Sequence, residues 1–212
     1  MNITAAIFDF DGTLFDSMPA WIGARDKFFA SLGVEMTEDD KAFFKGMFSS
    51  EALPLAIERF RLEMTYDEIL SKFFDYIKGR YMELAVPKND IIPFLEKLQA
   101  KGVKMGIATA SGEPAVIAAL EKFGMRHYFQ EIYSTYTVGV AKTEPKVYDV
   151  VREKLGTEKE TSWIFEDALY AAKTAKANGY PVVGIHDESE WHAQELQQIV
   201  DVYIHNYEEL DV

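Results

Sequence analysis

With 212 residues, of which 48% are hydrophobic and 27% charged, the chain has the size and composition of one globular core, or of a core with a small insert. It has no apolar run long enough to span a bilayer and no leader-like N-terminus, so we expect no membrane partner and a cytoplasmic location. The net charge of −13 argues against nucleic acid as a partner, because the long-range field repels polyanions. The absence of cysteine excludes disulfides and thiolate metal sites.

The first segment, "ITAAIFDF" at 3–10, predicts a short buried strand that ends in acids. Asp9 and Asp11 stand at its C-terminal end, where a buried carboxylate is costly unless it is paired or bound to a metal. The Asp-Gly pair at 11–12 is also a turn signal, so a simple turn is the alternative for this stretch taken alone.

Residues 18–84 predict a run of helices without a strand. Apolar residues recur at helical spacing, and Thr37 and Thr65 each precede an acid three residues on, as capping residues do. The helices are expected at 19–32, from 37, at 49–60 and at 65–84.

After a turn-like linker at 86–90, helices and strands alternate. Helices are predicted at 91–99, 114–123, 145–155 and 170–177, and they precede strands at 103–109, 131–136, 162–167 and 181–186. This alternation predicts a parallel sheet with helices on both faces, to which the first strand also belongs. Residues 18–84 are then an all-helical insertion after the first strand.

Polar residues gather at the C-terminal ends of the predicted strands. Ligands of open α/β sheets bind at that edge, and scattered turn residues would not need to converge there. The convergence favours a working site over a simple turn. The residues concerned are Asp9, Asp11, Thr109, Lys142, Glu166 and Asp167.

Four motifs in this order resemble the haloacid dehalogenase-like superfamily, specifically its phosphatases and phosphomutases with a helical cap. They are "DFDGT" at 9–13, "ATAS" at 108–111, "AKTEPKVY" at 141–148 and "IFEDA" at 164–168. The resemblance covers essentially the whole chain. It implies an α/β fold, a Rossmann-like doubly wound parallel sheet with an inserted all-helical cap domain. The catalytic core would comprise 1–17 and 86–212, and the cap 18–85.

The resemblance also implies a catalytic set. Asp9 would be the nucleophile that forms an aspartyl-phosphate, and Asp11 the general acid and base. Mg²⁺ would be held by the Asp9 carboxylate, the Asp11 carbonyl and the Asp167 carboxylate, with Glu166 contributing directly or through water.

Four further residues are candidates for binding phosphate or substrate. By resemblance, the Thr109 hydroxyl and the Ala110 N–H would donate to phosphate oxygens, and Lys142 would neutralise charge. Lys45, in the loop "FKGMFSS", would contact the rest of the substrate. The alternatives are a strand-end hydroxyl that bonds to backbone for Thr109, and solvated lysines for Lys142 and Lys45.

The choice of activity rests on a few positions. Asp11 points to phosphate chemistry, because the related dehalogenases lack it. Trp21, Ser49 and Gly112 stand where sugar phosphomutases typically carry His, Arg and Lys. We therefore expect a Mg²⁺-dependent, monomeric phosphatase of a small phosphorylated metabolite, such as a phosphosugar. A β-phosphoglucomutase-like mutase and a non-catalytic phosphate-binding protein are the alternatives.

Overall fold

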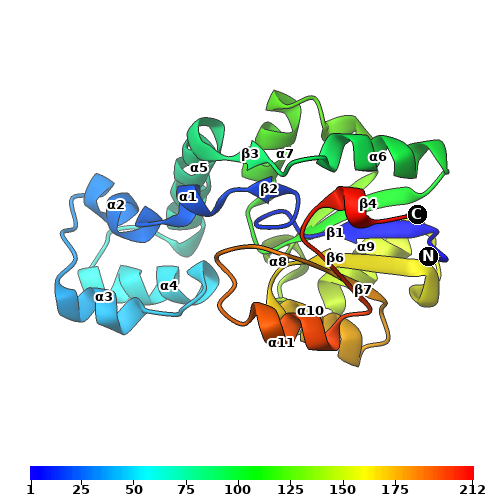
Figure 1. The fold of residues 1–212 in the computed structure, drawn as a ribbon. Helices are drawn as coiled ribbons and strands as arrows, with labels where there is room; N and C mark the ends of the chain where they lie inside the picture. Colours follow the sequence, from blue (N-terminus) through cyan, green and yellow to red (C-terminus); the bar gives the residue numbers. More distant parts are fainter.

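In the computed structural model, which describes residues 1–212, a six-stranded parallel sheet forms one lobe and five helices form a second lobe beside it (Figure 1). The strand order is β5-β4-β1-β6-β7-β8, so the first strand lies inside the sheet. The predicted doubly wound α/β fold is confirmed. The strands are β1 (Ala5–Phe8), β4 (Lys104–Thr109), β5 (Glu131–Ser134), β6 (Ser162–Glu166), β7 (Val182–Ile185) and β8 (Val202–Ile204).

Helices cover both faces of this sheet. In Figure 1, α6 and α7 lie above it, and α9, α10 and α11 lie on the other side. Parallel strands need such crossovers, because the chain must return to the same end of the sheet before each new strand. The bounds are α6 (Ile91–Ala100), α7 (Glu113–Lys122), α9 (Lys146–Leu155), α10 (Leu169–Ala177) and α11 (Ala193–Ile199).

The sequence of β1 reflects burial on both faces. Ala6 and Phe8 pack into the core that contains Phe94 of α6, whereas Ala5 and Ile7 pack into the core on the opposite face. A central strand therefore needs apolar residues throughout, and polar groups can appear only where it ends.

The second lobe holds only helices, as predicted for residues 18–84. The predicted helix at 19–32 is broken at Ile22 and Gly23, and Gly23 has a φ of 64° that favours glycine. Thr37 and Thr65 cap two helices as expected, each accepting a hydrogen bond from a backbone N–H three residues on. The helices are α1 (Met18–Trp21), α2 (Ala24–Ser31), α3 (Glu38–Phe44), α4 (Ser49–Phe60) and α5 (Tyr66–Leu84).

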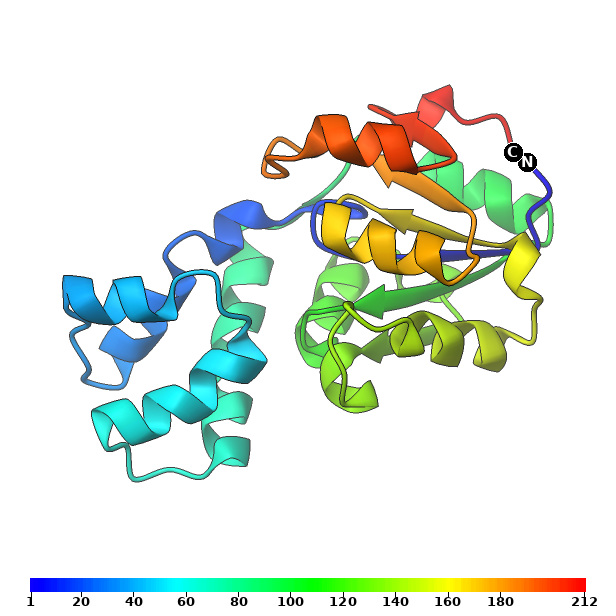
Figure 2. The same ribbon diagram turned by 90° about the horizontal axis from the view of Figure 1, so that it is seen from below.

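The chain crosses between the lobes twice, and the two crossings pair with each other. β2 (Phe15–Asp16) and β3 (Val86–Pro87) form an antiparallel ribbon, here called the hinge ribbon, where we expected only a linker. Lys88 follows it and makes ion pairs of 2.7 Å with Asp16 and with Asp187 of the sheet lobe. Figure 2 shows the helical lobe joined to the sheet lobe at this side, where α5 also packs along α7.

The remaining elements were not predicted. β8 is the edge strand next to β7, and α11 lies between these two strands in the sequence. None of the helices is both long and apolar enough to cross a membrane. Short helices complete the structure: α8 (Thr135–Val138), η1 (Arg126–Tyr128), η2 (Lys159–Thr161) and η3 (Tyr207–Glu209).

Candidate active site

The loop after β1 is built around an acid of the neighbouring strand. Asp9 is buried, and its N–H donates to the Phe165 carbonyl of β6 at 2.9 Å. Thr13 Oγ1 donates to Asp167 Oδ1 at 2.9 Å. Gly12 has a φ of 76°, and a Cβ there would lie 2.2 Å from Asp167 Oδ2. Only glycine therefore lets the loop close over Asp167, which explains the Asp-Gly pair that also read as a turn.

Three buried carboxylates meet at the ends of β1 and β6. Asp9, Glu166 and Asp167 each offer an oxygen, and these oxygens lie within 4.8 Å of one another. Lys142 donates to Asp9 Oδ1 and, at 2.8 Å, to Glu166 Oε2. Tyr148 donates its hydroxyl to the same Glu166 oxygen at 3.1 Å. We call Asp9, Glu166 and Asp167 the acid cluster.

One lysine does not balance this cluster. Burial raises the pKa of Asp9 from 3.8 to about 8, although Lys142 opposes the change. Burial, followed by the charges of Glu166 and Asp9, also raises the pKa of Asp167 well above its ordinary value. Burial alone would lower the pKa of Lys142, but the facing carboxylates raise it well above its ordinary range. The cluster thus lacks positive charge, and its all-oxygen donor set suits a hard divalent cation such as Mg²⁺.

The Asp11 side chain is bonded to a set of uncharged donors. Its Oδ1 accepts from Ser17 Oγ at 2.6 Å, from Trp21 Nε1 at 3.0 Å and from the Tyr81 hydroxyl. Its Oδ2 accepts from Ser111 Oγ. We call Ser17, Trp21, Tyr81 and Ser111 the Asp11 clasp.

Half of this clasp comes from the helical lobe. Trp21 ends α1 and Tyr81 lies in α5, so the position of the Asp11 carboxylate depends on where that lobe sits. Burial raises the pKa of Tyr81 well above its ordinary value, so its hydroxyl remains a donor. The sequence did not reveal the clasp, because a contact between lobes leaves no local pattern.

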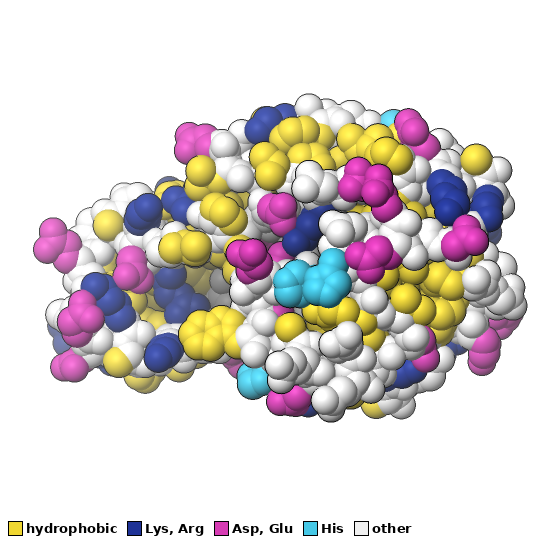
Figure 3. All heavy atoms as spheres, viewed as in Figure 1, with side chains coloured by type: hydrophobic (Ala, Val, Ile, Leu, Met, Phe, Trp, Pro, Cys, Tyr) yellow, Lys and Arg dark blue, Asp and Glu magenta, His cyan; other side chains and the backbone are white.

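A cavity of about 360 Å³ lies between the lobes, in the hollow region visible in Figure 3. Asp11 and Lys142 border it from the sheet lobe, and Arg25 and Met47 from the helices. A second cavity of about 260 Å³ contains the acid cluster and shares Asp11, Lys142 and Ala110 with the first. The two cavities together place the acid cluster beside a space for a small molecule.

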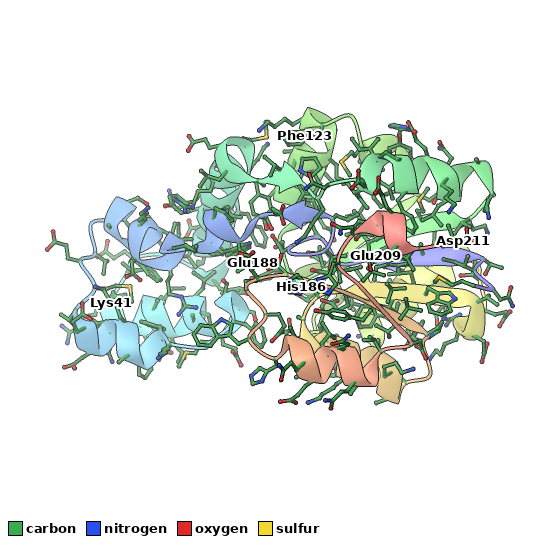
Figure 4. The ribbon with its side chains drawn as sticks, in the orientation of Figure 1. Lys41, Phe123, His186, Glu188, Glu209 and Asp211 are labelled. Carbon is green, nitrogen blue, oxygen red and sulfur yellow. The ribbon has the colours of Figure 1, made fainter.

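A larger cavity of about 540 Å³ contains none of the predicted site residues. It lies at the hinge ribbon and is bordered by Asp16, Lys88, His186 and Glu188, the last two labelled in Figure 4. Lys88 neutralises negative charge there, because it makes ion pairs with Asp16 and Asp187. Predicted site residues border the two smaller cavities instead, among them Asp9, Asp11 and Lys142.

The other predicted binding residues divide into two groups. Ala110 borders both smaller cavities, whereas Thr109 is fully buried and its Oγ1 accepts from the Ser111 N–H at 3.0 Å. Lys45 is exposed at the end of α3 and borders neither cavity. Arg25, which the sequence reading did not single out, lies at the cavity instead.

Comparison with known proteins identifies a family and relatives that share this fold. A family model described as haloacid dehalogenase-like hydrolase matches residues 6–185. A phosphorylated carbohydrates phosphatase of Thermotoga maritima is 26% identical over 175 residues, covering 82% of this chain and 81% of that protein. Hexitol phosphatase B of Escherichia coli is 26% identical over 190 residues, covering 83% and 80%. The crystal structure of CbbY from Rhodobacter sphaeroides with phosphate shares the fold, with a TM-score of 0.80, 20% identity and coverage of 98% and 96%.

Proposed function

Because this chain belongs to the haloacid dehalogenase-like hydrolases, we propose that it is a Mg²⁺-dependent phosphatase that works through an aspartyl-phosphate on Asp9. Three of its relatives are named as phosphatases, and phosphomonoester hydrolysis is the activity that this chain shares with them. The observation that carries the proposal is the acid cluster with Lys142 bonded to Asp9. The names of two relatives support a phosphorylated sugar or sugar alcohol as substrate.

In the first step, an Asp9 carboxylate oxygen forms a bond to phosphorus while the bond to the leaving oxygen breaks. Asp11 gives that oxygen a proton. In the second step, Asp11 takes a proton from water, the water oxygen bonds to phosphorus, and the bond between Asp9 and phosphorus breaks. Lys142 stays bonded to Asp9 and neutralises charge, and Ala110 would donate its N–H to a phosphate oxygen, with Thr109 beside it.

The Mg²⁺ proposal follows from the unbalanced charge of the acid cluster. Asp9 and Asp167 would hold the ion with the Asp11 carbonyl, and Glu166 would support it. When bound, the ion offsets the repulsion between carboxylate and phosphate dianion. Glu166 already accepts from Lys142 and Tyr148, so it orients Lys142 as well.

The helical lobe would act as a cap that closes over the substrate. We propose the domain boundaries expected from the sequence, with a core of 1–17 and 86–212 and a cap of 18–85. The hinge ribbon supports these limits, because its first strand ends at Asp16, two residues before the cap, and its second strand begins at Val86, directly after it. A monomer in the cytoplasm remains part of this proposal.

Two positions in the structure argue against the mutase alternative. Trp21, where mutases carry His, already donates to Asp11. At Gly112, where mutases carry Lys, a Cβ would lie 2.6 Å from the Phe74 ring of α5, so any side chain would displace that ring. Neither position is free for a group that holds a second phosphate during transfer.

Release of inorganic phosphate from p-nitrophenyl phosphate and from a panel of sugar phosphates tests the proposal. We expect release with Mg²⁺, none after chelation, and recovery when Mg²⁺ is restored. A purified, folded protein that releases no phosphate from any ester with Mg²⁺ would favour the non-catalytic binding protein. Conversion of one sugar phosphate to its isomer without phosphate release would favour the mutase.

A further inference from the structure

Arg25 is a cation of the cavity between the lobes that has no acidic partner. It lies near the start of α2, and its guanidinium donates to the carbonyls of Phe44 and, at 2.6 Å, Met47. No carboxylate oxygen lies within 4.0 Å of it. Burial lowers the pKa of Arg25, and the charge of Asp26 opposes this. A guanidinium nevertheless stays protonated in proteins, so the cavity contains a fixed positive charge.

The guanidinium also has unused donors. It carries five N–H groups, and the two carbonyl bonds use two of them. None of its nitrogens is sealed from solvent without a partner, so the remaining donors are open to a ligand. A half-buried cation of this kind is best satisfied by an anion that brings its own acceptors.

Among the charged residues around the cavity, Arg25 is the one available to bind an anion. Lys142 and Arg25 are its only cations, and Asp11 is its only acid. Lys142 is already bonded to two carboxylates of the acid cluster, and Asp11 is held by the uncharged clasp. Figure 3 shows Lys and Arg atoms lining the hollow on the side of the helical lobe. In a chain of net charge −13, this is a local site for negative charge.

We infer that Arg25 forms a second anion subsite, which selects phosphomonoesters carrying a carboxylate or a second phosphate at the end remote from the phosphate that is hydrolysed. The inference rests on the proposed phosphatase function. The planar fork of Arg25 matches the oxygens of either group, and a cavity of about 360 Å³ suits a small metabolite. A cationic contact was expected from Lys45 of the 44–50 loop; Arg25 reaches that same loop from α2.

Arg25 also ties α2 to the loop after α3, so a purely structural role must be separated from recognition. Arg80 of α5 provides the control. It donates to the carbonyls of Ala20, of Pro19 at 3.0 Å and of Ile22 at 3.2 Å, and it does not border the cavity. Arg80→Met and Arg25→Met therefore each remove a tether between an arginine and backbone carbonyls, but only the second removes a charge from the cavity.

The experiment compares kcat/KM for matched esters in the Mg²⁺-loaded full chain. One pair is phosphoglycolate and 2-hydroxyethyl phosphate, which differ in a carboxylate; the other is fructose 1,6-bisphosphate and fructose 6-phosphate. We expect the wild type to prefer the member with the second anion in at least one pair. Arg25→Met should lower kcat/KM for that member by about 10- to 100-fold more than for its neutral partner, the size of charge-assisted hydrogen bonds; any fall for the neutral partner reports the lost tether.

Arg25→Lys should keep part of the preference, because it retains the charge but not the fork. Arg80→Met should change both members of each pair by the same factor. The inference is wrong if Arg25→Met also lowers kcat/KM for both members of each pair equally. It is likewise wrong if the wild type prefers the neutral esters. Wild-type protein that hydrolyses no phosphate ester would instead contradict the proposed function, before any variant is compared.

Discussion

Acidic side chains in the two lobes have opposite surroundings. In the helical lobe, Asp40 accepts hydrogen bonds from the Thr37 N–H at 2.9 Å and Oγ1 at 2.6 Å, and it pairs with Arg59. These bonds from Thr37, followed by that from Arg59, lower its pKa to about 2. In the sheet lobe, burial raises the pKa of Asp9 and Asp167. Asp40, whose hydrogen bonds are satisfied within the protein, stabilises the start of α3. The acid cluster has one lysine for three carboxylates, which suits it to binding a ligand.

Asp9→Asn tests the functional side of this comparison and should have the largest effect. We expect phosphate release to fall by several orders of magnitude, as when a covalent nucleophile is removed. The melting temperature should stay nearly the same, because Asn has the size of Asp and Lys142 keeps its bond to Glu166. Steady-state kinetics and thermal melting measure the two. Substantial turnover in the purified variant would exclude Asp9 as nucleophile.

The pH dependence of Mg²⁺ binding tests the raised pKa values. Without metal, a folded-state pKa of about 8 for Asp9 means that its contribution to stability is present below pH 3.8 and is lost as the pH rises toward 8. Mg²⁺ competes with that proton, so its affinity should fall by up to about tenfold for each pH unit below 8. Calorimetric titration at pH 6, 7 and 8 measures this. An affinity that does not change with pH would mean that the cluster is already ionised.

Tyr81→Phe tests whether the helical lobe acts on the chemistry in the other lobe. Loss of the hydroxyl bonded to Asp11 should lower kcat by about tenfold, the size of one hydrogen bond to a charged group. Esters with poor leaving groups should be affected most, because they need the proton that Asp11 donates. Tyr76→Phe in the same helix is the control, since its hydroxyl has no hydrogen-bond partner in the structure. Equal effects of the two variants would make the clasp merely structural.

Asp40→Asn should have the smallest effect and should leave turnover intact. Its lowered pKa gives stability that is present above pH 3.8 and is lost as the pH falls toward 2. The variant should therefore melt a few degrees lower at neutral pH, and this difference should vanish near pH 2. Asp39→Asn, an exposed neighbour, is the control. A loss of turnover without a change in melting temperature would contradict the division between the lobes.

Local pattern was enough to predict most of the fold. The strand with Asp9, the alternation after residue 86 and the Thr caps all depend on neighbours in sequence, and the structure bears them out. The hinge ribbon and β8 were missed, because two or three residues at an edge carry no periodicity. The break at Gly23 was missed because helical spacing continued across it.

The candidate site was predictable where it lies on strand ends. Asp9, Lys142 and Asp167 converge because parallel strands end at one edge of the sheet. Trp21 and Arg25 could not be assigned this way, because their partners come from the packing of one lobe against another and of one helix against a loop. For the same reason Lys45 remains a prediction without a contact to support it.

The central position of β1 has a consequence for how the protein is made. Ala5 pairs with Lys104 and with Ser162, whereas α1, α2 and α4 of the inserted lobe pack on α5 within residues 18–84. At about 5–20 residues per second, roughly 8 to 30 seconds of synthesis separate Asp9 from Glu166. The contacts inside the helical lobe can therefore form while β1, which precedes Asp9, still has open edges. A nascent chain must include Asp167 before the acid cluster can assemble, so the residues needed for catalysis come together late in synthesis and in one step.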